Sequence, residues 1–286
     1  MKFALLITLL LAPLAALRAA GLLTPVDVAK PPVGVERIEL FLLIGQSNMK
    51  GRGEVPAEQT LNPRIVMMHL KNDQWYLAKH PVHIVSDPVT GKGGGNEGVG
   101  PGLAFAEVIT SKAPKVQVGL VPCAFGGSRL QLWMKGRRLY EDTVRRARLA
   151  LGVKTSVPVV LKGALWLQGE ADATPELQPT YQDRLVHMID DLRADLAAPN
   201  LPFIAATIGE FGGDTGTNSR AASKALINEA LLALPKVRPH TTCVDARDLK
   251  GHIGDGVHYN AASANTIGTR MAAKYLEMLK EPAKAP

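Results

Sequence analysis

The chain contains Phe41-Leu42-Leu43-Ile44-Gly45-Gln46-Ser47-Asn48-Met49, an apolar run that stops abruptly in Gly-Gln-Ser-Asn. The run predicts a strand over residues 37–44 that is buried on both faces, which is typical of parallel sheets. Gly45 permits a sharp turn that puts Ser47 at the carboxyl end of this strand, where open α/β sheets bind ligands. Ser47 is therefore either a nucleophile or, with Asn48, a cap of the next segment.

Composition favours one α/β domain, because 286 residues with 46% hydrophobic content can bury a single substantial core. The start of the chain has Lys2, an apolar stretch over residues 3–17 and no acidic residue, which is typical of a secretory signal. We expect a signal peptide at 1–20, export to the periplasm or the exterior, and one domain at 21–286. An uncleaved membrane anchor is the alternative, and no later stretch is apolar and long enough to span a bilayer.

The formal charge of +7 is modest, and no basic run is interleaved with aromatic residues, so nucleic acid is not an expected partner. The sequence has two cysteines, Cys123 and Cys243, which excludes a disulfide scaffold. Two buried free thiols are expected, and one bridge is the alternative.

Apolar strands alternate with amphipathic helices along the rest of the chain. Strands are expected at residues 37–44, 116–121, 159–167, 203–208 and 241–245, and helices at 103–111, 138–151, 178–196, 219–234 and 261–279. This alternation predicts a three-layer α/β/α sandwich around a five-stranded parallel sheet. Residues 65–70 and 74–78 are expected to form a hairpin that decorates the main sheet.

A glycine-rich stretch, residues 91–102, holds seven glycines. A phosphate-binding loop would need Gly-Lys-Ser/Thr after a strand, but a glycine follows Lys92 and no strand precedes it, so nucleotide binding is rejected. The stretch either lets backbone approach a site or is a flexible surface loop.

The segment Gly254-Asp255-Gly256-Val257-His258-Tyr259-Asn260 precedes the last expected helix. A serine becomes a good nucleophile only when a base takes its proton and a third group orients that base. Asp255 and His258 are three residues apart in one loop and could supply both groups for Ser47.

An acyl-transfer site also needs donors directed at the developing oxyanion. The backbone N–H groups of Ser47 and Gly126 and the side-chain amide of Gln168 follow three strand ends that should meet at one edge. Taken singly, Gly126 reads as an ordinary turn and Gln168 as a strand-end hydrogen bond, so only the combination favours this role.

Three further side chains are candidates for substrate contact. Trp133 follows a glycine turn and could stack on a sugar, and Arg129 lies close by in the sequence. Glu170 could orient the base, bind sugar or form a structural salt bridge. No cluster of His, Cys and acidic residues has the spacing of metal ligands, so neither a metal nor another cofactor is expected.

Four motifs together resemble the SGNH hydrolase superfamily, and within it the branch of sialate O-acetylesterases and acetylxylan esterases. They are Gly45-Gln46-Ser47-Asn48-Met49, Pro122-Cys123-Ala124-Phe125-Gly126-Gly127, Leu165-Trp166-Leu167-Gln168-Gly169-Glu170-Ala171-Asp172 and Asp255-Gly256-Val257-His258. The superfamily's usual Gly-Asp-Ser is Gly-Gln-Ser here, and Gln168 stands for its usual Asn. The acetylesterase branch shares both substitutions.

The resemblance implies a flavodoxin-like sandwich that hydrolyses acetyl esters on carbohydrates without a metal. Carried over to this sequence, Ser47 is the nucleophile, His258 the base and Asp255 its orienting acid, while Gly126 and Gln168 join the Ser47 amide in the oxyanion hole. An esterase or thioesterase for lipid-like acyl esters and a catalytically silent carbohydrate-binding protein are the alternatives. The acetylated sugar and the oligomeric state stay open.

Overall fold

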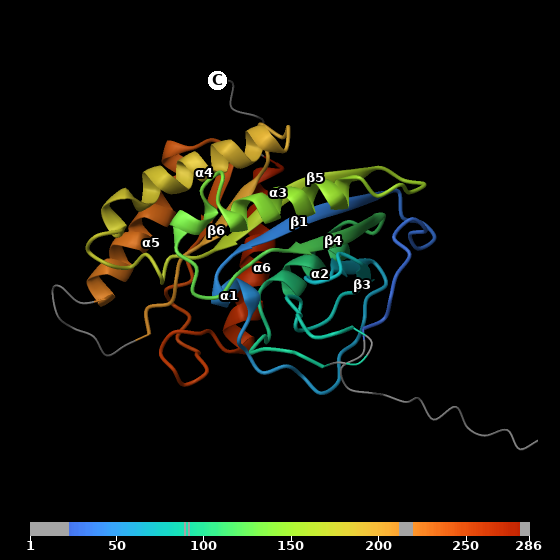
Figure 1. The fold of residues 1–286 in the computed structure, drawn as a ribbon, viewed down its shortest axis with the longest axis horizontal. Helices are drawn as coiled ribbons and strands as arrows, with labels where there is room; N and C mark the ends of the chain where they lie inside the picture. Colours follow the sequence, from blue (N-terminus) through green and yellow to red (C-terminus); the bar gives the residue numbers. More distant parts are fainter. Residues whose placement is uncertain (1–22, 89, 91, 212–219, 281–286) are drawn as a thin grey trace, which may run out of the picture.

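Strand β1 (Arg37–Gly45) lies in the middle of the sheet, between β4 (Val116–Pro122) and β5 (Val159–Leu167), and pairs with both in parallel (Figure 1). The computed structural model describes residues 23–88, 90, 92–211 and 220–280. Beyond β5 follow β6 (Phe203–Ala206) and β7 (Thr241–Val244), again parallel. The five strands expected from the sequence therefore form one continuous parallel sheet.

The hairpin at 65–77 corrects the prediction of a five-stranded sheet. Strand β2 (Ile65–Met68) pairs in parallel with β4, and β3 (Trp75–Leu77) pairs antiparallel with β2. The hairpin is thus part of the main sheet, which has seven strands in the order β3-β2-β4-β1-β5-β6-β7. Strand β2 pairs with the edge of β4 that β1 does not occupy. Local sequence patterns do not reveal which strand edge is free for pairing.

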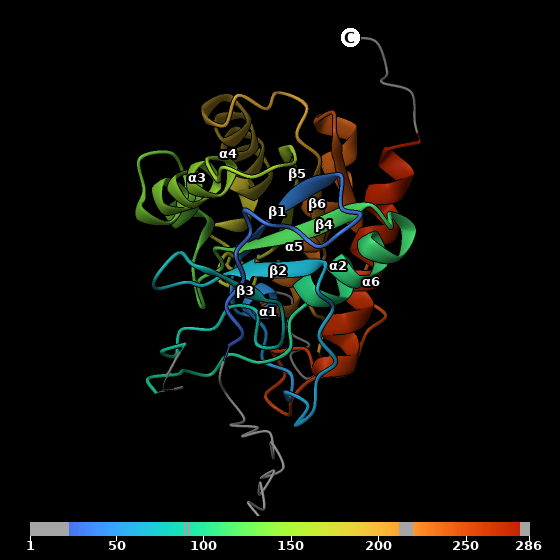
Figure 2. The same cartoon turned by 90° about the vertical axis from the view of Figure 1, so that its right-hand side faces the viewer.

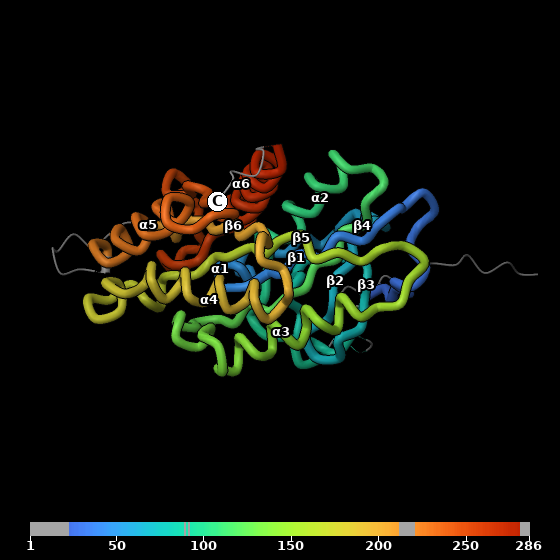
Figure 3. The backbone as a smooth tube through the Cα atoms, turned by 90° about the horizontal axis from the view of Figure 1, so that it is seen from above, coloured from blue at the N-terminus to red at the C-terminus, as the bar shows by residue number. Residues whose placement is uncertain are grey.

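Helices cover both faces of the sheet, which confirms the three-layer α/β/α sandwich. Figures 2 and 3 show α3 (Arg138–Leu151) and α4 (Tyr181–Asp195) on one side, and α2 (Gly102–Lys112) and α6 (Ala261–Met278) on the other. Helix α5 (Arg220–Val237) packs against β7 and α4. The short elements are α1 (Ser47–Lys50) and the 3₁₀ turns η1 (Leu130–Trp133) and η2 (Gln178–Thr180). The predicted start of α5, residue 219, lies outside the described residues.

The side chains of β1 explain why this strand is central. Leu40 and Leu42 point into the hydrophobic cluster under α3 and α4, whereas Phe41 and Leu43 point into the cluster under α2 and α6. All four are at most 1% exposed. Burial of an aliphatic or aromatic side chain stabilises a fold by about 1.5–3 kcal/mol, so both cores depend on this strand.

Gly45 ends β1 with a backbone that other residues rarely adopt, at φ 132°. A Cβ at this position would lie 2.3 Å from the carbonyl oxygen of Leu167 on β5. Only glycine fits this turn, and the turn brings Ser47 to the carboxyl edge of the sheet.

Candidate active site

Ser47, Gly126 and Gln168 follow the carboxyl ends of β1, β4 and β5, which are neighbours in the sheet. The loop before α6 carries Asp255 and His258 to the same edge, since His258 contacts Ser47. The structure therefore brings together the residues that the sequence predicts for catalysis, although 211 positions separate Ser47 from His258.

The three polar side chains Ser47, His258 and Asp255 form a continuous hydrogen-bonded line. His258 Nε2 is 2.8 Å from Ser47 Oγ, and His258 Nδ1 is 2.5 Å from Asp255 Oδ2. Ser47 is buried, whereas the side chain of Asp255 is 39% exposed. With the proton on Nδ1, the geometry leaves Nε2 free to accept from the serine hydroxyl.

Asp255 is also fixed by its own loop. Its Oδ1 accepts from the backbone N–H groups of Val257 and His258, each at 2.9 Å. Burial acts to raise the pKa of this carboxyl, but the hydrogen bonds from the His258 ring and from the two N–H groups outweigh burial and lower the pKa to about 2. Asp255 is therefore ionised at neutral pH.

Asn48 connects the serine turn to the histidine loop, a role that the sequence analysis did not assign. Its side-chain Nδ2 donates to Val257 O at 3.1 Å and to Glu170 Oε1, and its Oδ1 accepts from Tyr259 N at 3.0 Å. Asn48 is 3% exposed. Its place directly after Ser47 was the available signal.

Two of the predicted oxyanion donors are backbone N–H groups with no backbone acceptor among the described residues. The N–H of Ser47 belongs to the first turn of α1, where N–H groups have no partner inside the helix. The N–H of Gly126 likewise donates to no backbone carbonyl in the part of the chain that the structure describes. Both are thus available to an oxygen beside Ser47.

Gln168 does not fit the predicted third donor. Its Nε2 donates to Ser128 O at 3.0 Å and to Asp172 Oδ2 at 2.6 Å, which uses both of its hydrogens, and the residue is fully buried. Tyr181 donates to its Oε1 at 3.0 Å. Gln168 therefore holds the loop after β4 in place, and the prediction of an oxyanion donor is wrong in this structure.

A pocket of about 770 Å³ opens beside Ser47 and His258. Arg129 and Glu170 line it, as the sequence analysis expected of substrate contacts. Glu170 is 2% exposed, and burial raises its pKa, against the hydrogen bond from Asn48 and the nearby positive charges. The wall carries charges of both signs, which suits a ligand rich in hydroxyl groups.

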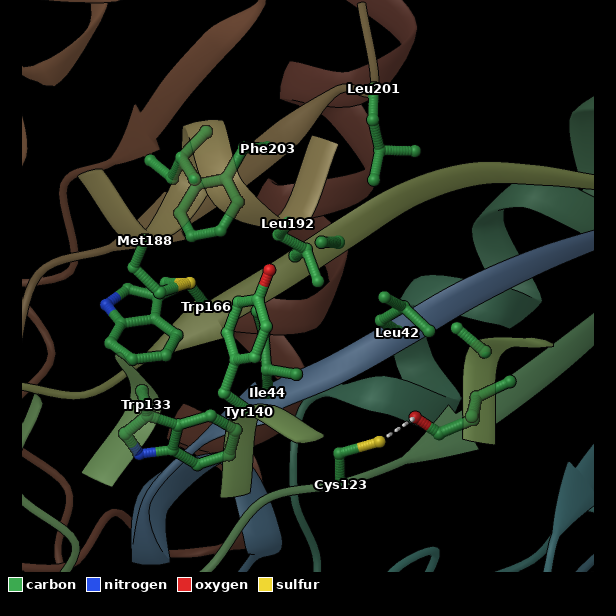
Figure 4. Packing of buried hydrophobic residues seen from close by; sticks show 14 of the residues in the cluster. Leu42, Ile44, Cys123, Trp133, Tyr140, Trp166, Met188, Leu192, Leu201 and Phe203 are labelled. Carbon is green, nitrogen blue, oxygen red and sulfur yellow. Dashed lines mark hydrogen bonds between the residues drawn. The ribbon is translucent and has the colours of Figure 1, made fainter. Parts of the chain in front are cut away.

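Trp133 is not part of this pocket, and the prediction that it stacks on a sugar is wrong. It is 1% exposed and packs edge-on against Trp166, with the ring centroids 5.5 Å apart (Figure 4). Its Nε1 donates to Ser128 Oγ at 3.0 Å. The indole points into the core because η1 turns its apolar side toward α3 and α4.

Arg52 and Asn96 line the pocket but were not expected there. Asn96 lies in the glycine-rich stretch, so that stretch does approach the site, as one of its two interpretations held. Arg52 is five residues after Ser47, and this proximity was the available signal. Its guanidinium lies close to both Gly126 and Ser47, because a Cβ on Gly126 would be 3.1 Å from Arg52 Nη2 and 3.9 Å from Ser47 Cβ.

Among the described residues, no group of three or more His, Cys, Asp or Glu side chains is placed to hold a metal ion. Cys123 and Cys243 are both free thiols, as expected; Cys123 is buried, whereas Cys243 is only partly buried. No helix within the described ranges is long and apolar enough to cross a membrane. The predicted leader, residues 1–20, lies outside those ranges.

An α/β/α sandwich with a serine after its central strand and an Asp-x-x-His loop before its last helix defines the SGNH hydrolase class. The chain belongs to the family described as carbohydrate esterase, sialic acid-specific acetylesterase, which it matches over residues 37–277. The resemblance to the acetylesterase branch of the SGNH hydrolases is thereby confirmed.

Comparison with individual proteins is consistent with membership of this family. The chain is 32% identical to a probable carbohydrate esterase of Arabidopsis thaliana over 255 residues, which is 83% of this chain and 90% of the relative. A crystal structure of a protein from Arabidopsis thaliana superposes with a TM-score of 0.69 at 30% identity, covering 84% of this chain and 98% of that one. The crystal structure of NanS has a TM-score of 0.64 at 19% identity, covers 91% of this chain and 100% of its own, and shows likeness of fold.

Proposed function

We propose that this protein is a serine esterase that removes O-acetyl groups from carbohydrates through an acetyl-enzyme on Ser47. The observation that carries the proposal is the line from Ser47 Oγ to His258 Nε2 at 2.8 Å and from His258 Nδ1 to Asp255, at the wall of a pocket. A nucleophile, a base and an orienting carboxylate in contact are what acyl transfer by serine requires.

In the first half of the reaction, Ser47 Oγ attacks the acetyl carbonyl carbon while His258 Nε2 takes the hydroxyl proton. The carbonyl π electrons move onto oxygen, and the N–H groups of Ser47 and Gly126 stabilise this oxyanion. The intermediate collapses by breaking the bond to the sugar oxygen, which leaves with the proton from His258. The acetyl group is then bound to Ser47.

In the second half, His258 takes a proton from water as the water oxygen attacks the acetyl-enzyme. Collapse of the second tetrahedral intermediate releases acetic acid, and His258 returns the proton to Ser47 Oγ. Asp255 keeps the imidazole in the required tautomer and stabilises its positive charge in both halves.

The family description and the name of the Arabidopsis relative support a carbohydrate as the acetylated molecule. The polar wall of the pocket, with Arg52, Arg129 and Glu170, supports it as well, since hydroxyl groups need donors and acceptors. O-acetyl sialic acid and acetylated xylan are the two substrates to compare first. The same charges disfavour lipid-like acyl chains, and the intact Ser47–His258–Asp255 line disfavours a protein that only binds sugars.

We also propose that the protein is exported, on the evidence of its predicted leader. The charged start and apolar stretch of residues 1–17 support export by a signal peptide. Expression of the full chain in a bacterial host, followed by mass measurement of the periplasmic product, tests this. A product that keeps its first 20 residues in the cytoplasm would overturn it.

The test of function is acetate release from acetylated xylan and from O-acetyl sialic acid by wild type and Ser47→Ala. We expect release from at least one substrate and a loss of at least about a thousandfold in the variant. A series of aryl esters from acetate to octanoate separates the alternatives, because an acetylesterase loses activity steeply beyond acetate. Preference for long chains would support the lipid-like alternative, and binding of acetylated sugar with no ester turnover would support the silent binding protein.

A further inference from the structure

Arg52 lines the same pocket as Ser47, and most of its hydrogen-bond donors are unused. Its Nη1 donates to Gly51 O at 2.9 Å. Its Nε is buried and has no partner among the residues that the structure describes, and its Nη2 makes no hydrogen bond to them. A half-buried guanidinium with donors left over next to a reacting serine is prepared for an acceptor that arrives with the substrate.

The space over Gly126 is where such an acceptor fits. A Cβ at this position would be 3.1 Å from Arg52 Nη2 and 3.9 Å from Ser47 Cβ, and the glycine leaves this volume empty. The guanidinium and the serine therefore both border this volume, next to the Cα of Gly126. A carbonyl oxygen attacked by Ser47 would develop its charge in this region.

The side chain predicted as the third oxyanion donor is engaged elsewhere. Gln168 donates both amide hydrogens, to Ser128 O and to Asp172. The N–H groups of Ser47 and Gly126 remain available to an oxyanion. We propose that Arg52 Nη2 supplies the third donor, and that this arginine stabilises the tetrahedral oxyanion of the esterase reaction proposed above, on which the inference rests.

A guanidinium suits this task. Burial lowers the pKa of Arg52, and the charges of Glu97 and Asp255 oppose that effect, so the group stays a cation at neutral pH. A hydrogen bond from a charged donor is about twice as strong as one from a neutral amide. Because the charge is fixed before the reaction, no reorganisation is needed when the oxyanion forms.

The glycine-rich stretch holds Arg52 in this position. Gly53 and Val99 exchange two backbone hydrogen bonds, of 3.2 and 2.8 Å, and Gly98 N donates to Gly51 O at 3.0 Å. A Cβ on Gly98 would lie 2.2 Å from Gly53 O, so the two segments touch backbone to backbone. An ion pair between Lys50 Nζ and Glu97 Oε1, at 2.8 Å, also joins these two segments. The glycine-rich stretch thus has a structural role beside the site, because its glycines let the two backbones touch.

The test measures kcat and KM of wild type, Arg52→Met and Arg52→Lys on 4-nitrophenyl acetate and on an acetylated sugar. Both substrates form the same oxyanion, but only the second carries a sugar. We expect Arg52→Met to lower kcat on both by about a hundredfold, as loss of one oxyanion donor does, with KM nearly unchanged. Arg52→Lys should keep part of the activity, because lysine retains the charge without the planar fork.

Arg148→Met is the matched control, since Arg148 is an exposed arginine of α3 outside the pocket, and it should leave kcat unchanged. Thermal unfolding of each variant checks that the fold is intact, and Arg52→Gln replaces Arg52→Met if the latter does not fold. A kcat within threefold of wild type on 4-nitrophenyl acetate would overturn the inference, whatever happens to KM on sugar. A wild type that hydrolyses no acetyl ester would instead overturn the proposed function.

Discussion

Replacing Asn48 by alanine is expected to destabilise the fold and slow the reaction together. The side chain makes three hydrogen bonds, to Glu170, to Val257 O and from Tyr259 N, in a region that is almost fully buried. A neutral hydrogen bond contributes about 1 kcal/mol, and one to a carboxylate about 1.5–3 kcal/mol. The free energy of unfolding should therefore fall by about 3–5 kcal/mol, a large part of the 5–15 kcal/mol typical of a domain.

The assay combines urea unfolding with steady-state kinetics on an aryl acetate. Asn260→Ala is the matched control, because Asn260 lies in the same loop but caps α6, accepting from Ser263 N at 3.0 Å, and does not reach the serine turn. Loss of this cap should cost about 1 kcal/mol and leave kcat close to wild type. If Asn48→Ala lowers the free energy of unfolding no more than Asn260→Ala and has the same kcat, Asn48 does not couple the serine turn to the histidine loop.

Two further outcomes follow from the pKa directions. Asp255→Asn should lower kcat by about a hundredfold or more. Hydrogen bonds from the His258 ring and from two backbone N–H groups lower the pKa of Asp255 from its ordinary 3.8 to about 2, so the stability they contribute is present above about pH 4 and is lost as the pH falls through 2. An acid limb of kcat/KM assigned to this carboxyl above pH 4 would contradict the structure. Burial raises the pKa of Cys123 to about 11 and that of Cys243 to about 12. Both thiols should therefore react with a disulfide reagent at pH 8 far more slowly in the native protein than in urea. Rapid labelling of Cys123 in the native protein would contradict this prediction.

The sheet could be predicted from sequence wherever a pattern is local. The apolar run before Gly45 predicted a strand buried on both faces, and β1 has Leu42 in one core and Phe41 in the other. Because parallel strands end at one edge, the same reasoning predicted that Ser47 and Gly126 would meet. The addition of β2 to the sheet was missed, since a pairing between Ile65 and Val118 leaves no local signal.

The site was predictable to the level of which segments meet, and less so for the direction of each side chain. Gln168 follows β5 as expected, but its amide turns to Asp172, a buried carboxylate that competes for the same hydrogens. Trp133 follows the glycine turn as expected, but the core between α3 and β5 takes its ring. In both cases tertiary packing decides the orientation, and sequence spacing does not carry that information.

Ser47 and His258 are 211 positions apart, so the site can form only late in synthesis and folding. A polypeptide that emerges from the ribosome presents Ser47 long before His258, and β1 has neither neighbour until β4 and β5 have been synthesised. Long-range pairing of this kind slows folding, because loop closure must precede the contacts that reward it. Under the proposed mechanism, a shortened chain without the last loop and α6 lacks His258 and should show no turnover. Recovered turnover during refolding would then report completion of the whole sandwich.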